Sequence, residues 1–435
     1  MTVRPAREVV RSASRALLSV HQWQTRVVLW TAAAAVGAAA VAFAWIADVA
    51  QELFRRLHSG FWLYPWLVAP LGFAVISWLT RRFFPGAEGS GIPQTIFALR
   101  PTSGDQGTRL LEPRVVIGRV VLAAAALLSG ASIGREGPTV HVGAAVARFF
   151  GRWMPHSTQP GQSRALVLAG GAAGVAAAFN TPLAGIVFAI EELSRSFEER
   201  ASGVALTAVI LAGVIAIALT GDYTYFGQPV VSEEAHSLSM GVVTLALASG
   251  LAGGLFSRVT LIGVARIRVA MARSTQIRAA LLAALCGAAV AVVGHFSGGL
   301  TYGTGYNEAR SILEGHAHLP WYYGPARAVA TLAAYLSGVP AGLLAPSLSV
   351  GAGLGQAAAD WGHQATPVPF AILGMCGYLA GVTQAPLTSL VIVMEMTTQH
   401  AMVLPLMVTV AVATTASKLL SPPLYRTLSE QRYGA

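Results

Sequence analysis

The segment Ser129 to Gly143, SGASIGREGPTVHVG, places two charged residues, Arg135 and Glu136, inside an otherwise apolar part of the chain. A charged side chain at membrane depth costs roughly 2.5 to 3.5 kcal/mol on insertion scales, so such residues usually mark a pathway or a partner. Pro138 suits the first turn of a helix, and the glycines before it allow a tight turn. A helix that begins here presents unpaired N–H groups and a partial positive charge, which favour an anion.

Glu136 carries its own negative charge at the position where such a helix start would hold an anion. A carboxylate tethered there would compete with a free anion, as a gate does. Burial and a neighbouring anion both favour the protonated form, which can swing away, so proton binding would be coupled to anion movement. The alternative is that Arg135 and Glu136 form a buried ion pair with a structural role only.

The composition indicates a chain that crosses a membrane several times. Of 435 residues, 54% are hydrophobic and only 11% are charged, whereas a soluble domain is about a quarter charged. The mean hydropathy is +0.59, and apolar runs of about 20 residues, enough to cross a bilayer, recur throughout. The 46 glycines and 22 prolines predict several short or broken helices.

The net charge of +10 does not indicate a nucleic-acid partner, because the arginines lie in loops and in the N-terminal tail, as the positive-inside rule predicts. Cys286 and Cys376 lie within apolar runs, so no disulfide framework is expected. We expect a basic cytoplasmic segment over residues 1–25, one transmembrane domain over residues 26–426, and a short cytoplasmic tail over residues 427–435. Both termini are therefore expected in the cytoplasm.

Membrane helices are expected wherever an apolar run is long enough. The first begins near Val27; it is too long for a signal-peptide core and has no clear cleavage site. The predicted apolar segments are residues 27–54, 61–80, 115–128 (interrupted by Arg119), 165–192, 204–220, 240–265, 279–295, 326–351, 370–396 and 402–419. The predicted polar or basic loops are residues 101–114, 156–163, 221–236 and 266–278.

An internal repeat divides the transmembrane domain into halves of about residues 26–220 and 238–426. Two sets of residues recur at the same spacing: Ser129-Gly130, Pro138 and Gly143 match Ser337-Gly338, Pro346 and Gly351, while Thr181-Pro182-Leu183 and Glu191 match Ala385-Pro386-Leu387 and Glu395. Two halves with interrupted elements indicate a transporter or channel whose site lies between the repeats.

The repeat also separates structural carboxylates from candidates for function. Glu191 corresponds to Glu395, so both are expected to be structural. Glu136 and Glu192 correspond to uncharged residues in the other half, so symmetry does not require them. Adjacent residues on a helix point about 100° apart, so Glu191 and Glu192 are not expected to share one role.

Four short motifs resemble those of the CLC family of chloride channels and transporters. They are GSGIP, GREGP, GLLAP and a late Pro-Leu-Tyr, in the family's order, and the likeness extends from about residue 25 to residue 426. The resemblance implies an all-α polytopic membrane protein of two inverted-topology repeats with broken and tilted helices, assembled as a homodimer with one anion path per subunit. The residues of the three pentapeptides are Gly89, Ser90, Gly91, Ile92, Pro93, Gly134, Arg135, Glu136, Gly137, Pro138, Gly342, Leu343, Leu344, Ala345 and Pro346.

The resemblance implies a central anion held by the hydroxyls of Ser90 and Tyr425 and by the backbone N–H groups of Leu343 and Leu344, with the amides of Gly89 and Ser90 nearer the cytoplasm. Hydroxyls and amides can replace the hydration shell of an anion without a full positive charge, and conduction requires binding weak enough for release. The alternatives are that Ser90 only caps a helix and that Tyr425 is an interfacial tyrosine.

The resemblance further implies an outer anion site at Arg135, Glu136 and Gly137, with Glu136 as the external gate. Glu192 resembles the inner glutamate through which protons reach the cytoplasm; alternatively, it only pairs with a loop arginine. His141 lies one turn after Glu136 and could relay protons, although a hydrogen-bonded core histidine is the simpler interpretation.

Two residues depart from the family pattern. Leu344 stands where relatives usually have phenylalanine, which leaves open the width and hydrophobicity of the path near the central site. Gln94 follows GSGIP where many relatives have glutamate. The backbone donors do not depend on either side chain.

We therefore predict an antiporter, not an enzyme, that exchanges chloride for protons across the inner membrane of a cell and needs no cofactor or metal. A passive chloride channel of the same fold is the first alternative, and Glu192 discriminates, because a channel needs no inner proton acceptor. A fluoride exchanger is disfavoured by Ser90 and Tyr425, a pair that the fluoride branch usually lacks. An intramembrane enzyme would use Ser90 or Ser129 as nucleophile, but no histidine stands in a comparable motif to activate either.

Overall fold

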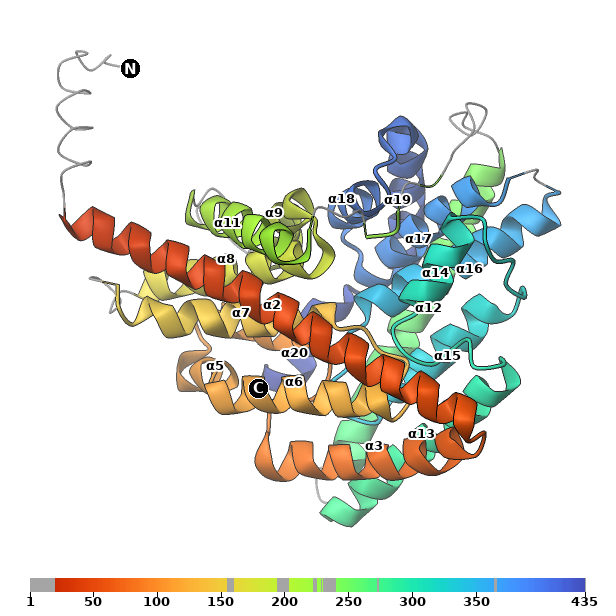
Figure 1. The fold of residues 1–435 in the computed structure, drawn as a ribbon, viewed down its shortest axis with the longest axis horizontal. Helices are drawn as coiled ribbons and strands as arrows, with labels where there is room; N and C mark the ends of the chain where they lie inside the picture. The colour runs from red at the N-terminus through yellow and green to blue at the C-terminus, as the bar shows by residue number, and fades with distance from the viewer. Residues whose placement is uncertain are drawn as a thin grey trace.

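The structure is a computed structural model that describes residues 20–154, 160–193, 203–221, 225–227, 229, 240–271, 274–363 and 366–434. These residues form an assembly of helices with no named strand among them (Figure 1). The first half contains α2 (Val20–Gly60), α3 (Tyr64–Phe83), α4 (Ile92–Ala98), α5 (Gly104–Leu110), α6 (Pro113–Leu128), α7 (Glu136–Gly151), α8 (Pro160–Phe179), α9 (Pro182–Phe188), the π-helix η1 (Ala189–Leu193) and α11 (Gly203–Thr220). The second half contains α12 (Met240–Met271), α13 (Gln276–Phe296), α14 (Tyr306–Leu313), α15 (Tyr323–Leu336), α16 (Leu344–Trp361), α17 (Val368–Thr383), α18 (Pro386–Thr397), the 3₁₀-helix η3 (His400–Met402), α19 (Val403–Lys418) and α20 (Leu424–Tyr433).

The helices differ widely in length. Among the described residues, Trp23–Gly60, Met240–Met271 and Gln276–Phe296 are each long and apolar enough to cross a membrane. Other apolar helices, such as Pro386–Thr397, are too short to do so alone. Short helices that end inside a membrane protein leave backbone groups there, which is tolerated where they line a pathway. Much of the predicted segments 1–25, 156–163 and 221–236 lies outside the described residues.

Three apolar segments that were predicted as single runs are divided in the structure, so those predictions were wrong. Residues 165–192 form α8, α9 and η1; residues 326–351 form α15 and α16; residues 370–396 form α17 and α18. Conversely, α6 is continuous through Arg119, and the polar loop predicted over residues 101–114 contains α5.

The breaks after α8 and α17 have the same cause in both halves. Asn180 and Gln384 have φ values of 56° and 57°, in the left-handed region that ends a helix. Pro182 and Pro386 follow at the starts of α9 and α18, where a missing N–H is harmless. The apolar pattern continues across both breaks, and it therefore conceals them.

The two halves meet at an approximate two-fold axis. Gly134 and Gly342 occupy the same position in GREGP and GLLAP, and they exchange backbone hydrogen bonds of 2.8 Å and 3.1 Å. Equivalent residues can bond reciprocally only where the axis passes between them. This contact agrees with the repeat that the sequence predicts.

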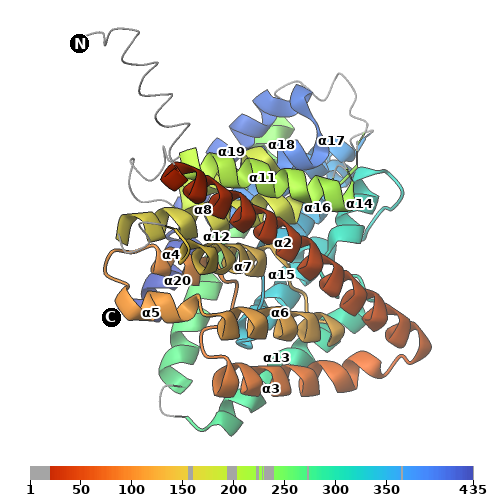
Figure 2. The same ribbon diagram turned by 60° about the vertical axis from the view of Figure 1, so that its left-hand side comes forward.

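Helix α2 runs obliquely across the molecule in both views (Figures 1 and 2). Helices α3 and α13 pack side by side, as do α7 with α8 and α16 with α17. The last helix, α20, returns to the first half and packs against α4, with Leu428 and Ser429 buried. Residues 427–433, predicted as a tail, therefore belong to a packed helix.

Candidate functional site

Three glycine-rich turns converge at the centre of the molecule. Gly89 donates its N–H to the carbonyl of Val339 at 3.1 Å and accepts the N–H of Ala341 at 3.1 Å. A Cβ added to Gly137 would lie 2.6 Å from the carbonyl oxygen of Ser90, so only glycine allows this approach. The structure thus brings GSGIP, GREGP and the turn before GLLAP together, as the sequence predicts.

Each turn leads directly into a helix. Helix α4 begins at Ile92, α7 at Glu136 and α16 at Leu344, so their first N–H groups face the region where the turns meet. The hydroxyl of Ser90 accepts the N–H of Ile92 at 3.2 Å and is fully buried. Ser90 therefore bonds to the first N–H of α4, whose N-cap position is Gly91; because Ser90 is the acceptor in that bond, its hydroxyl proton can still be donated.

Glu136 is fully buried at the start of α7. Neither carboxyl oxygen has a hydrogen-bond partner among the described residues. The backbone N–H groups of Arg135, Glu136 and Ala345 face the carboxyl group, although none reaches normal hydrogen-bond geometry. A Cβ on Gly134 would lie 2.4 Å from Oε2, so the carboxyl group lies against the two-fold contact. It occupies a place where helix N-termini favour an anion.

Arg135 forms an ion pair with Asp48 on α2, at 2.6 Å, while its charge stays within electrostatic range of Glu136. It also donates to the carbonyl of Ala44 at 3.1 Å. The alternative in which Arg135 and Glu136 form a closed structural pair is therefore wrong. Thr139 donates to the carbonyl of Arg135 at 2.8 Å and fixes the turn.

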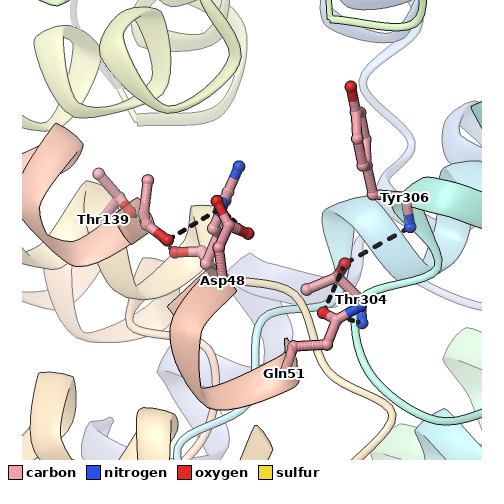
Figure 3. A network of polar contacts seen from close by, with 7 residues as sticks. Asp48, Gln51, Thr139, Thr304 and Tyr306 are labelled. Carbon is pink, nitrogen blue, oxygen red and sulfur yellow. Dashed lines mark hydrogen bonds and ion pairs between the residues drawn. The ribbon is translucent and has the colours of Figure 1, made fainter. Parts of the chain in front are cut away.

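A cavity of about 550 Å³ opens beside Arg135 and Asp48. Gln51 lines it and accepts hydrogen bonds of 3.2 Å from both the N–H and the hydroxyl of Thr304 (Figure 3). The guanidinium group of Arg135 lines the cavity, and Glu136 is the next residue in the chain.

Tyr425 lies in the first turn of α20 and is fully buried. Its hydroxyl has no hydrogen-bond partner among the described residues, and it lies within electrostatic range of Glu136 and Glu192. Leu344 lies with Tyr425 and Glu192 around a small void of about 10 Å³. An unpartnered buried hydroxyl needs an explanation such as an absent ligand. Leu344, which departs from the family pattern, thus lies beside the same void as Tyr425 and Glu192.

Glu192 lies in η1 and is 4% exposed. Its Oε1 has no hydrogen-bond partner among the described residues. Arg426 lies nearby, but it donates a hydrogen bond of 2.7 Å to the backbone carbonyl of Glu191. Among the residues that the structure describes, Glu192 forms no ion pair with an arginine.

Glu191 and Glu395 form a symmetric pair of helix caps. Glu191 accepts the N–H groups of Leu387 and Thr388, at 3.2 Å and 2.7 Å, at the start of α18. Glu395 accepts the N–H groups of Leu183 and Ala184, at 3.1 Å and 2.7 Å, at the start of α9. Each half therefore caps a helix of the other half, in agreement with the predicted structural role.

Two residues that the sequence did not single out for function hold the loop before Ser90. Arg119, fully buried in α6, donates to the carbonyls of Gly89 and Gly86, both at 2.8 Å. The side-chain amide of Gln94 donates to Gly86 at 3.1 Å and to Glu88 at 2.6 Å. An ionised glutamate could not donate these bonds, which explains why the amide suits this position.

Arg119 has a counterpart in the second half. Arg327, at the same place relative to the repeat, is fully buried and donates to the carbonyls of Leu300 at 2.9 Å and Gly303 at 2.6 Å. Arg119 and Arg327 stand at matching positions of two apolar runs, and this match in the sequence could have predicted their bonds to loop carbonyls. His141 is satisfied at Nε2 by the carbonyl of Leu110 at 2.9 Å, as the simpler interpretation predicts.

Comparisons with known proteins agree on one family. A family profile described as voltage gated chloride channel matches residues 72–418. The H(+)/Cl(-) exchange transporter ClcA of Cronobacter sakazakii is 30% identical over 411 residues, which cover 90% of this chain and 86% of that protein. ClcA of Klebsiella pneumoniae subsp. pneumoniae is 31% identical over 390 residues, which cover 84% of this chain and 80% of that protein.

Solved structures share the fold. A slow cyanobacterial Cl⁻/H⁺ antiporter has a TM-score of 0.79 at 24% identity, covering 94% of this chain and 98% of that one. A CLC-type fluoride/proton antiporter has a TM-score of 0.74 at 21% identity, covering 94% of this chain and 98% of that one. At these identities the structural likeness concerns the fold and does not distinguish the transported anion.

Proposed function

This chain belongs to the voltage-gated chloride channel family, and we propose that it is a secondary active antiporter that exchanges chloride for protons across a membrane. The observation that carries the proposal is a pair of buried carboxyl groups, Glu136 and Glu192, with the unpartnered hydroxyl of Tyr425 within electrostatic range of both. The names of relatives that are about 30% identical support the same exchange.

The anion path uses neutral donors. The hydroxyls of Ser90 and Tyr425 and the backbone N–H groups of Leu343 and Leu344 bind the central anion, and the Ser90 amide binds it nearer the cytoplasm. The N–H of Gly89, which the family resemblance also implies there, is already bonded to the carbonyl of Val339. Partial charges at the starts of α4 and α16 support the binding without a full positive charge. The anion is therefore held weakly enough to leave.

Glu136 is the external gate, and Arg135 and Gly137 complete the outer anion site. As a carboxylate, Glu136 occupies the outer site and excludes the anion. When it binds a proton, it loses its attraction to the surrounding N–H groups, and an anion takes its place. This exchange links one proton-binding event to movement of the anion.

Glu192 is the internal proton acceptor. It is buried, it lies within electrostatic range of Tyr425 as Glu136 does, and it is close to the positive charge of Arg426. A carboxyl group without a closed partner can gain and lose a proton as the local field changes. The residue therefore passes protons between Glu136 and the cytoplasm.

The physiological setting follows from the same account. The protein is a homodimer with one path per subunit in the lipid bilayer of an inner cell membrane, with both termini in the cytoplasm. The transmembrane domain includes all of α2 (Val20–Gly60) and α20 (Leu424–Tyr433), so it extends beyond the predicted bounds of residues 26–426 on both sides. Chloride and protons are its substrates, and it needs no cofactor, metal or nucleic acid.

The test uses purified protein in liposomes with equal chloride on both sides, the voltage set to zero with potassium and valinomycin, and an imposed pH gradient. An exchanger accumulates chloride on the side that loses protons. A passive channel leaves chloride at equilibrium, and that result would refute antiport. Fluoride in place of chloride tests the anion: a fluoride exchanger would move fluoride faster.

A further inference from the structure

The end of α7 carries two arginines that the anion path does not use. Arg148 lies in the last turn of the helix and Arg152 directly follows it, so the two side chains, four residues apart, share one face. Among the residues that the structure describes, neither arginine forms an ion pair. The end of a helix tolerates positive charge, but two like charges at this spacing repel each other. An anion bound between them would relieve that repulsion.

Both arginines line a cavity of about 320 Å³. This volume is at the lower end of the range for small-molecule pockets, about 300 to 1,000 Å³. Its other walls are apolar and include Leu111 after α5, Pro113 at the start of α6 and Leu166 in α8. Glu112 lies within electrostatic range of Arg148 but does not line the cavity. The charged groups in the lining are therefore the two guanidinium groups.

The guanidinium group of Arg152 is held between two aromatic rings. Its central carbon lies 3.7 Å from the centre of the Phe149 ring and 4.4 Å from the centre of the Trp153 ring. Stacking covers the faces of a guanidinium group and leaves its N–H edges free to bind a phosphate with two parallel hydrogen bonds. Trp153 is 47% exposed, and tryptophan is enriched where a membrane meets water. This arrangement suits a phosphate group at the membrane surface.

The cavity lies on the side of the molecule where α2 begins. Leu166, which lines it, also lies with Leu29 of α2 around a small neighbouring void. Helix α5 and the start of α2 lie on the left in both views (Figures 1 and 2). Because the N-terminus is expected in the cytoplasm, this side faces the cytoplasmic leaflet, whose lipids carry negative charge.

An apolar strip leads from the cavity into the membrane. Pro113, Ile117 and Val121 are spaced by four residues, so they share one face of α6. Ile117 and Val121 are 61% and 58% exposed. Helix α6 starts at the cavity and ends before the central GREGP turn, so the strip extends along the bilayer depth. A lipid chain can lie on such a strip, whereas a soluble anion would not use it.

We propose that this cavity binds the headgroup of an anionic phospholipid. The phosphodiester accepts hydrogen bonds from Arg148 and Arg152, and an acyl chain lies along Ile117 and Val121. A lipid bound there holds the end of α7, the helix that begins at Glu136, at the membrane surface. A different prediction follows if the arginines only orient the chain in the membrane, as the positive-inside rule describes. In that case the protein does not discriminate between headgroups.

Native mass spectrometry of the purified, delipidated full-length protein measures the binding of phosphatidylglycerol and of phosphatidylcholine. The wild type should bind phosphatidylglycerol more tightly, because the choline group cancels the phosphate charge. Arg148→Gln and Arg152→Gln should each weaken phosphatidylglycerol binding about tenfold, the loss expected for one hydrogen bond to a charged group. Equal binding of the two lipids by the wild type, or wild-type binding by the double variant, would overturn the proposal.

Arg82→Gln is the matched control. Arg82 lies near the end of α3, with its guanidinium carbon 5.6 Å from the centre of the Phe83 ring, and it does not line the cavity. Since α3 returns to the side where α2 begins, this variant removes a comparable arginine on the same side of the membrane. It should bind phosphatidylglycerol as the wild type does, and an equal loss in this variant would show that surface charge alone attracts the lipid.

Two measurements on the wild type do not depend on the stability of any variant. Excess inorganic phosphate should leave the bound phosphatidylglycerol in place; displacement would identify a site for a soluble anion and overturn the lipid assignment. A cryo-electron microscopy map of the protein in phosphatidylglycerol nanodiscs should show a phosphate between Arg148 and Arg152 and a chain beside Ile117. An empty cavity in that map would also overturn the proposal.

Discussion

Replacing Glu191 or Glu395 should weaken the fold and leave proton coupling intact. Each carboxylate accepts two N–H groups at the start of a helix in the other half, at distances between 2.7 Å and 3.2 Å. A hydrogen bond to a charged group contributes about 1.5 to 3 kcal/mol, and the lower end applies because one bond of each pair is exposed. Glutamine keeps one acceptor oxygen, so Glu191→Gln should lower the free energy of unfolding by about 1.5 kcal/mol. Alanine loses both bonds, and the expected loss is about 3 kcal/mol.

Unfolding of the purified variants in mixed detergent micelles measures this loss, and exchange in liposomes measures coupling. The approximate two-fold symmetry supplies the matched control, because Glu395→Gln should destabilise by the same amount as Glu191→Gln. Glu192→Gln changes the adjacent residue and serves as a contrast. It replaces a carboxyl oxygen that has no hydrogen-bond partner among the described residues, so the free energy of unfolding should be unchanged while proton transport is lost. The reasoning is refuted if Glu191→Gln abolishes coupling at unchanged stability, or if only one of the two caps matters.

Other substitutions test the outer site. Glu136→Gln mimics the protonated gate, so chloride flux should persist while proton movement stops; pH-driven proton uptake in this variant would contradict the gate assignment. Gly134→Ala should impair exchange at least as strongly as Glu136→Gln does, because the added Cβ would lie 2.4 Å from the Glu136 carboxylate. Wild-type exchange rates in Gly134→Ala would show that the carboxyl group lies elsewhere. Asp48→Asn removes the ion-pair partner of Arg135 and should increase the apparent chloride affinity by about two- to fivefold, since a partly exposed ion pair contributes about 0 to 1 kcal/mol. Weaker chloride binding in half-saturation measurements would contradict this prediction.

The sequence predicted the site better than the helices that carry it. Gly134 and Gly342 bond across the two-fold axis, and Gly137 approaches Ser90 so closely that no side chain fits. Close backbone approaches of this kind require glycine at single positions, so they appear in the sequence as short glycine-containing motifs. The helix break at Asn180 is signalled only by Pro182, which served to recognise the repeat and not to place a break, because the apolar run continues past it.

Contacts between distant parts of the chain were beyond the sequence. The repeat predicted that Glu191 and Glu395 are structural, but not that each caps a helix in the other half. Asp48 reaches Arg135, and Arg119 reaches the carbonyls of Gly89 and Gly86, from other helices, and neither residue belongs to a motif. Their roles depend on where those helices cross, which local patterns do not encode.

The central claim is that chloride movement is linked to proton movement through Glu136 and Glu192. The most direct test loads liposomes containing the purified protein with high chloride and records chloride efflux and external pH together, with potassium and valinomycin setting the voltage. We predict that the chloride gradient drives protons uphill in the wild type, and that Glu136→Gln and Glu192→Gln release chloride without moving protons. Chloride efflux from the wild type with protons remaining at equilibrium would contradict the account and identify the protein as a passive channel.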